Sequence, residues 1–156
     1  MPIYAPQKLC LPKRGDYIGA LSWLYAVREK LGESFVFALD EALMCLGYFR
    51  GRSDEFVVWG YGNNDLAVRF NGVVVLGETV DYCNVKEKNG LLYTDFNRTI
   101  ADALAMEEFL DMQGITEALG WYYDHNGESF EGIVVAPEYK ESFEKLLKDA
   151  IRYYES

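Results

Sequence analysis

The sequence predicts an α+β domain in which an antiparallel β-meander of four to six strands packs with about five helices. Strand-forming residues fill the middle of the chain, from Glu55 to Thr94, and two Asn-Gly pairs interrupt them, Asn71-Gly72 and Asn89-Gly90. Such pairs are the strongest short signal for a hairpin turn. Apolar residues at helical spacing lie on both sides of this region. We therefore expect helices before and after the sheet.

The length of 156 residues and a hydrophobic content of 50% predict one folded domain with a substantial core. Residues 1–15 contain three prolines and have no regular period, so they predict an extended N-terminal segment. The single α+β domain is then expected to span residues 16–156.

The cysteines and the apolar runs predict a cytoplasmic protein that does not bind membranes. Cys10, Cys45 and Cys83 are odd in number and widely spaced, which is typical of reduced thiols. No apolar run approaches the roughly 20 residues that a membrane-spanning helix needs.

Before the meander, the pattern predicts a helix, a short strand and a second helix. Asp16 is a candidate N-cap for the first helix, and Gly32 ends its apolar pattern. Residues 34–37 could form a strand. The second helix is expected around residues 39–46, ending near Gly47 or Gly51.

The meander itself is expected to contain up to five strands, at residues 55–61, 66–70, 73–76, 79–87 and 91–94. After it, three helices are predicted, at residues 97–112, 115–125 and 137–154. A further strand is expected at residues 130–136, Phe-Glu-Gly-Ile-Val-Val-Ala, directly before the last helix. The last helix has Pro137 in its first turn, where proline is favoured.

The helix after the meander carries Arg98 and Asp102 one turn apart, on the same side as the apolar Met106 and Phe109. Two charges facing a core are tolerated when they pair with each other. We expect a structural ion pair. A catalytic carboxylate oriented by arginine is the alternative, but no third group nearby in the sequence would complete such a site.

An acidic block follows, because no lysine or arginine occurs between Arg98 and Lys140 while nine carboxylates do. We expect a protein-binding surface formed by the residues of this block that project from the core: Glu107, Glu108, Asp111, Glu117 and Asp124. Its negative charge favours a partner protein with a basic surface and disfavours nucleic acid. The alternative is that the charge serves only solubility.

The segment Arg98-Thr99-Ile100-Ala101-Asp102 after a strand-rich region resembles the "RT(I/L)xD" element of type IV bacterial antitoxins, the AbiE family of abortive-infection systems. The segment from Phe35 to Gly47 is also similar to the helix that precedes the first strand in that family. The resemblance implies an antitoxin-like or abortive-infection-associated regulator. The family usually begins with a DNA-binding winged helix-turn-helix, and the N-terminal segment here is too short to form one.

Two other functional classes remain open. One is an inhibitor from a phage or mobile element, of the anti-CRISPR or antirestriction type, whose acidic surface mimics nucleic acid. The other is a degenerate metal-dependent nuclease or nucleotidyltransferase. For the latter, Asp65 is a single carboxylate where that chemistry needs two, and Asn84 stands where a nuclease would have a second acid after Asp81.

No complete catalytic signature supports an enzyme. His125 is the only histidine, there is no Cys-x-x-Cys pair, and no glycine-rich phosphate-binding loop is present. The sequence therefore predicts a protein-binding protein with no catalytic residues, no metal site and no cofactor.

Overall fold

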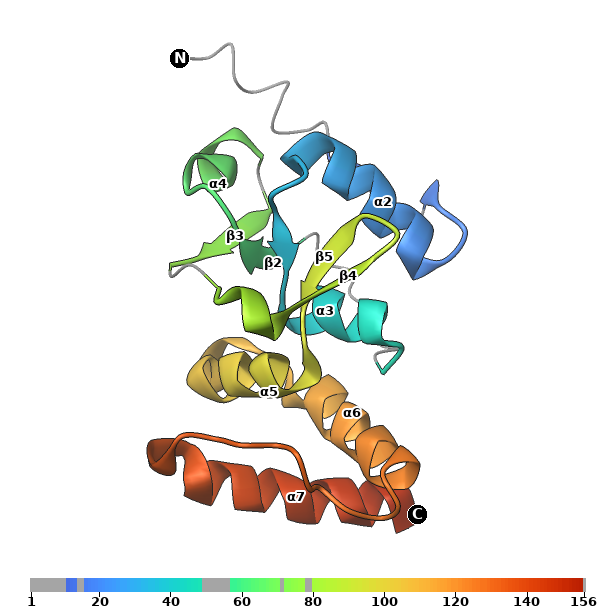
Figure 1. The fold of residues 1–156 in the computed structure, drawn as a ribbon, viewed down its shortest axis with the longest axis vertical. Coiled ribbons are helices and arrows are strands. Elements are labelled where there is room, and N and C mark those ends of the chain that lie inside the picture. The colour runs from blue at the N-terminus through green and yellow to red at the C-terminus, as the bar shows by residue number, and fades with distance from the viewer. Residues whose placement is uncertain (1–10, 14–15, 49–56, 71, 78–79, 156) are drawn as a thin grey trace.

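The computed structural model describes residues 11–13, 16–48, 57–70, 72–77 and 80–155. Within these residues, one five-stranded sheet packs with six α-helices, so the predicted α+β class is confirmed. The sheet occupies the middle of the molecule, with α2 and α4 towards one end of the long axis and α5, α6 and α7 towards the other (Figure 1). Most of the predicted extended segment, residues 1–10 and 14–15, lies outside the described residues.

The sheet is mixed, so the predicted antiparallel meander is wrong. Its strands are β1 (Val36–Phe37), β2 (Val58–Tyr61), β3 (Val73–Leu76), β4 (Val85–Lys88) and β5 (Leu91–Thr94), in the spatial order β3-β2-β1-β5-β4. The pairs β1/β2 and β4/β5 are antiparallel, whereas β2/β3 and β1/β5 are parallel. The strand nearest the N-terminus therefore lies at the centre of the sheet.

The reason for the parallel β2/β3 pair is α4 (Asp65–Arg69), which forms where residues 66–70 were predicted to be a strand. Leu66 and Phe70 are buried, while Val68 between them is 69% exposed. A strand would place all three side chains on one face, whereas a helix places only the residues four apart together. The helix carries the chain back across the sheet, so β3 runs parallel to β2. Of the predicted Asn71-Gly72 turn, Asn71 lies outside the described residues.

The second predicted turn, Asn89-Gly90, is confirmed. It joins β4 to β5 with Lys88 paired to Leu91, and both turn residues have positive φ angles, 51° and 92°. This conformation is the one that Asn-Gly favours in two-residue hairpins. The strand predicted at residues 79–87 is shorter than expected, because Tyr82–Asn84 form one turn of 3₁₀ helix (η3) and β4 begins only at Val85.

Two helices flank the first strand. The helix α2 (Ala20–Leu31) ends at Gly32 as predicted, but it begins after Gly19, so the predicted cap at Asp16 is wrong. The helix α3 (Leu39–Leu46) ends at Gly47, whose φ of 83° places it in the left-handed region that favours glycine. Strand β1 is therefore held between two helices by very short connections.

The C-terminal part is helical: α5 (Phe96–Ala105), a 3₁₀ turn η4 (Glu107–Phe109), α6 (Met112–His125), a 3₁₀ turn η5 (Pro137–Tyr139) and α7 (Lys140–Glu155). The C-terminal ends of α6 and α7 lie near each other, and the segment between them runs back along α7 (Figure 1).

The strand predicted at residues 130–136 is wrong, because this returning segment has no regular structure. Its backbone is hydrogen-bonded by side chains instead of by a neighbouring strand. The amide of Val134 donates to Asn97 Oδ1 over 2.7 Å, and the carbonyl of Glu131 accepts from Tyr122 Oη over 2.6 Å.

Two hydrophobic clusters fill the interior of the part of the chain that the structure describes. One lies between α2 and the sheet around Phe35 and Phe37, and the other lies among α3, α5, α6 and α7 around Leu43 and Ile100. Each helix in the described part of the chain is too short or too polar to cross a bilayer.

Candidate functional site

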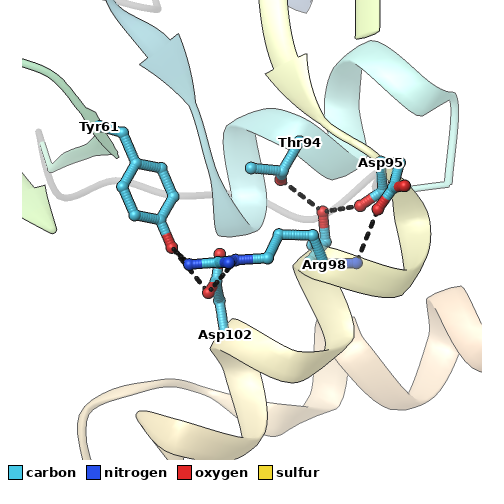
Figure 2. Close-up of polar contacts among 6 residues, drawn as sticks. Tyr61, Thr94, Asp95, Arg98 and Asp102 are labelled. Carbon is cyan, nitrogen blue, oxygen red and sulfur yellow. Dashed lines mark hydrogen bonds and ion pairs between the residues drawn. The ribbon is translucent and has the colours of Figure 1, made fainter. Parts of the chain in front are cut away.

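The junction between β5 and α5 fixes the direction of the first turns of α5. Asp95 caps the helix by accepting a hydrogen bond from the amide of Arg98 over 2.7 Å. The hydroxyl of Thr99 donates to the carbonyl of Asp95 and lies 2.7 Å from the hydroxyl of Thr94 (Figure 2). These contacts attach α5 to the end of β5, so that Arg98 and Asp102 point towards β2.

Arg98 and Asp102 meet Tyr61 from β2 in a three-membered cluster (Figure 2). Asp102 Oδ1 accepts from Tyr61 Oη over 2.7 Å and from Arg98 Nε over 3.0 Å. Arg98 Nη2 donates to Tyr61 Oη over 2.8 Å, and the guanidinium carbon lies 5.2 Å from the centre of the tyrosine ring. We call these three residues the inner cluster.

The inner cluster is largely removed from water, with the Asp102 side chain 10% exposed and the Arg98 side chain 27% exposed. Burial raises the pKa of Asp102, although hydrogen bonds from Tyr61 and the charge of Arg98 oppose the rise. Burial, followed by the hydrogen bond to Asp102, also raises the pKa of Tyr61. For Arg98, burial lowers the pKa, but the contacts to Tyr61 and Asp102 outweigh it and raise the value overall. The tyrosine thus stays neutral and the arginine stays charged.

The chemistry available to the inner cluster is limited because its polar atoms bind one another. Among the buried polar atoms of the cluster, the exception is Asp102 Oδ2, which has no hydrogen-bond partner among the described residues. The only hydroxyl of the cluster, that of Tyr61, donates to Asp102, is buried and has a raised pKa, so it is a poor nucleophile. It joins α5 to β2 and accounts for two charges inside the fold.

A groove of about 390 Å³ lies on the sheet face that Tyr61 shares. Its floor is a row of directly paired residues, Leu76, Tyr61, Val36 and Leu92, one from each of four neighbouring strands. Polar side chains also line it: Ser34, Asn63 and Asn64 from neighbouring loops, and Tyr82 from η3. Sequence reasoning missed this groove because its residues come from separate strands whose order was predicted incorrectly.

The residues considered for enzyme chemistry have structural roles or lie at the surface. Asp65 begins α4, and Asp81 caps η3 by accepting from the amide of Cys83 over 3.2 Å. Burial, and then Glu41, raise the pKa of Cys45 to about 12, so its thiol stays protonated. His125 is exposed at the end of α6. In the described part of the chain, no three histidine, cysteine or acidic side chains lie close enough to share a metal ion.

The five predicted protein-binding carboxylates lie on η4, at the N-cap of α6 and on α6, and we call them the acidic face: Glu107, Glu108, Asp111, Glu117 and Asp124. Glu117 is half-buried and the other four are exposed. Across the described residues, no lysine or arginine nitrogen lies within 4.0 Å of any of them, and only His125 approaches one, at 3.9 Å from Asp124. Their charge is therefore not neutralised by a neighbouring cation.

The acidic face is extended, since α6 separates Asp111 from Asp124 by roughly 20 Å at 1.5 Å per residue. One member also has a structural role that the sequence did not reveal. Asp111 caps α6 by accepting from the amide of Gln113 over 3.0 Å, and the side chain of Gln113 in turn donates to Glu117 over 3.2 Å.

No protein-family model, curated protein or solved structure matches this chain. The resemblance to the AbiE antitoxins therefore stays a prediction. In the structure, its most specific residues, Arg98 and Asp102, belong to the inner cluster and bind within the fold.

Proposed function

We propose that this chain is a non-enzymatic protein that binds a partner protein with a basic surface through the acidic face. The observation that carries the proposal is the set of five carboxylates on η4 and α6, none of which has a lysine or arginine within 4.0 Å in the described part of the chain. Unpaired surface charge of one sign steers an oppositely charged partner and raises the association rate.

The charge on the acidic face also fits the expectation that nucleic acid is not the ligand. Residues 99–139 contain nine carboxylates and no lysine or arginine. Binding to a phosphate backbone gains its affinity from lysine and arginine, which are lacking here. A nucleic-acid-binding protein, by contrast, presents the surface that this face would recognise.

The AbiE resemblance suggests that the partner is a toxin, and the role is then antitoxin-like. On this proposal, the buried and the exposed charged residues have different roles. The inner cluster holds α5 in place, and the acidic face contacts the partner. An inhibitor that mimics nucleic acid would use the same surface. It would differ in one respect, because its partner would release nucleic acid on binding.

The test uses charge reversal with a matched control. Glu107→Lys/Glu117→Lys reverses two members of the acidic face and leaves the Asp111 cap intact. Glu29→Lys/Glu87→Lys makes the same change in net charge at exposed positions on α2 and β4. Association rates are measured against the protein that co-purifies with the parent chain, at low and at high salt.

We expect the first variant to associate at least about tenfold more slowly than the parent at low salt. The difference should shrink at 1 M salt, where the screening length falls to about 3 Å. The control variant should stay within about twofold of the parent, since its charges lie away from the contact. Equal effects of the two variants would show that only net charge matters and would overturn the proposal.

A further inference from the structure

A second surface feature lies beside the acidic face, between α6 and α7. A cavity of about 360 Å³ is lined there by Gly120, Trp121, Asp124, Tyr153 and Tyr154, which we call the aromatic pocket. The glycine permits the close approach of the two helices, because a Cβ at position 120 would lie 3.1 Å from Cδ1 of Tyr153. Three aromatic side chains therefore surround one carboxylate at the surface.

Trp121 and Tyr154, two of the three rings of the aromatic pocket, are held by contacts outside it. The indole of Trp121 stacks on His125, with ring centres 5.1 Å apart and an angle of 22° between the planes. Tyr154 packs edge-on against Tyr123 at 5.2 Å. Trp121 and Tyr154 are nevertheless each 38% exposed, and Tyr153 is 42% exposed. The walls are thus positioned in advance, which lowers the entropic cost of binding.

The electrostatic environment of the pocket is negative. Glu117, Trp121 and Asp124 follow one another at helical spacing on the same side of α6, so the pocket continues the acidic face. Partial burial, followed by the charges of Asp124 and Glu128, raises the pKa of Tyr154. On α7, the nearest arginine in sequence, Arg152, pairs with Asp149 at 3.8 Å.

Aromatic faces grouped around a carboxylate are suited to a cation. The negative face of an aromatic ring attracts a cation within about 6 Å of its centre, and tryptophan does so most strongly. A guanidinium group can stack on an aromatic plane and pair with a carboxylate at the same time, since it is flat and carries donors along its edge. An ammonium group offers only a point charge to the same site.

We propose that the aromatic pocket binds an arginine side chain of the basic partner, with the guanidinium stacked on the pocket rings and paired with Asp124. This inference rests on the proposed function, because it assumes a basic partner. It adds a specific anchor to a surface that otherwise acts through long-range charge. Buried aromatic and arginine contacts of this kind carry a large share of the binding energy in protein interfaces.

The test compares two peptides, acetyl-Gly-Arg-Gly-amide and its citrulline counterpart, in which a neutral urea of nearly the same shape replaces the guanidinium. Binding is followed by NMR through the indole N–H resonance of Trp121, with the indoles of Trp23 and Trp59 as internal controls. We expect a saturable shift at Trp121 with a dissociation constant on the order of 1 mM for the arginine peptide. The citrulline peptide should bind at least about fivefold more weakly.

Three variants complete the experiment. Asp124→Asn preserves the shape of the pocket and removes its charge, and we expect it to weaken arginine binding about fivefold. In Trp121→Ala the resonance is lost, so binding is followed through the backbone amide of Tyr153, and a similar weakening is expected. Tyr82→Ala removes a tyrosine that is 88% exposed beside Asp81, outside the pocket, and should leave binding unchanged. Equal binding of the two peptides, or no shift at Trp121, would overturn the inference.

Failure of the pocket and failure of the proposed function can be told apart with the whole partner. If the pocket holds an arginine, Trp121→Ala should raise the dissociation rate about fivefold and leave the salt dependence of association unchanged, since it alters no charge. A slow association of Glu107→Lys/Glu117→Lys, together with an unaltered dissociation of Trp121→Ala, would overturn the pocket alone.

Discussion

The carboxylates of α5 and α6 lie in opposite environments. Asp102 on α5 is 9% exposed and accepts hydrogen bonds from Tyr61 and Arg98, whereas the acidic face on η4 and α6 is mostly exposed and has no lysine or arginine within 4.0 Å among the described residues. Removal from water is costly for a charge unless it is paired, and exposure to water removes that requirement. The interior charge therefore serves the fold, and the exterior charges remain available to a partner.

The largest effect expected from this comparison is on stability. Asp102→Ala leaves Arg98 without its partner in a largely buried position, and we expect a loss of about 3 kcal/mol in the free energy of unfolding. The figure lies at the lower end for a broken buried pair, because Arg98 is 27% exposed and can reach some water. Chemical denaturation of the parent and the variant measures it.

A double variant controls for the lost charge. Arg98→Met/Asp102→Leu removes both charges, and it should recover part of the stability lost in Asp102→Ala, since no unpaired charge remains. Glu108→Ala, an exposed member of the acidic face, should change stability by less than about 0.5 kcal/mol. If Asp102→Ala is as stable as Glu108→Ala, the proposed difference between the buried and the exposed carboxylates is wrong.

Loss of a helix cap is expected to have an intermediate effect on stability, for a half-buried cap and an exposed cap alike. Asp95 caps α5 and Asp111 caps α6, so each substitution to alanine should cost about 1 kcal/mol, although Asp111 is exposed. Asparagine at either position should restore most of the loss, because its oxygen can still accept the amide hydrogen bond. Thermal unfolding of Asp111→Ala and Asp111→Asn checks this, and equal destabilisation by both would show that the charge, and not the cap, matters.

The smallest effect is a pH dependence specific to Asp102. Because burial raises its pKa in the folded state above the ordinary value of 3.8, the folded state holds this proton more tightly than the unfolded state does. The associated stability is fully present below about pH 3.8 and is lost as the pH rises through the folded-state pKa. The parent should therefore lose stability relative to Asp102→Asn as the pH rises above 4. A loss of stability as the pH falls would instead show that the contacts to Tyr61 and Arg98 lower the pKa of Asp102 more than burial raises it.

The sequence predicted the parts of the fold that depend on local signals. Asn89-Gly90 forms its hairpin, Gly32 and Gly47 end their helices, and the last helix follows Pro137. Each of these features depends on residues close to one another in the chain. Alternation alone could not separate helix from strand at residues 66–70, because Leu66, Val68 and Phe70 alternate and Leu66 and Phe70 also lie four apart. That one ambiguity changed the predicted neighbour of β2, because α4 takes the place of the intervening strand and β3 pairs with β2 directly.

The residues of the candidate sites could likewise be predicted only where they are close in sequence. Helical spacing placed Arg98 and Asp102 together, but nothing in the sequence indicates Tyr61, which comes from a strand 37 residues earlier than Arg98. The aromatic pocket likewise combines Trp121 and Asp124 of α6 with two tyrosines of α7. Contacts between distant elements require the packing of those elements to be known.

Strand β1 has a consequence for the order in which the sheet assembles. It contains only Val36 and Phe37, yet it joins the β3-β2 pair to the β5-β4 pair by bonding with β2 on one side and β5 on the other. The hairpin β4-β5 closes over two residues and the β2-α4-β3 unit is also local, so each half can form quickly. Joining them needs β1 to pair with β5, and Val36 and its partner Leu92 are far apart in sequence, so this contact is slow to form. The pairing of β1, the shortest strand, with β5 should therefore limit the rate of folding.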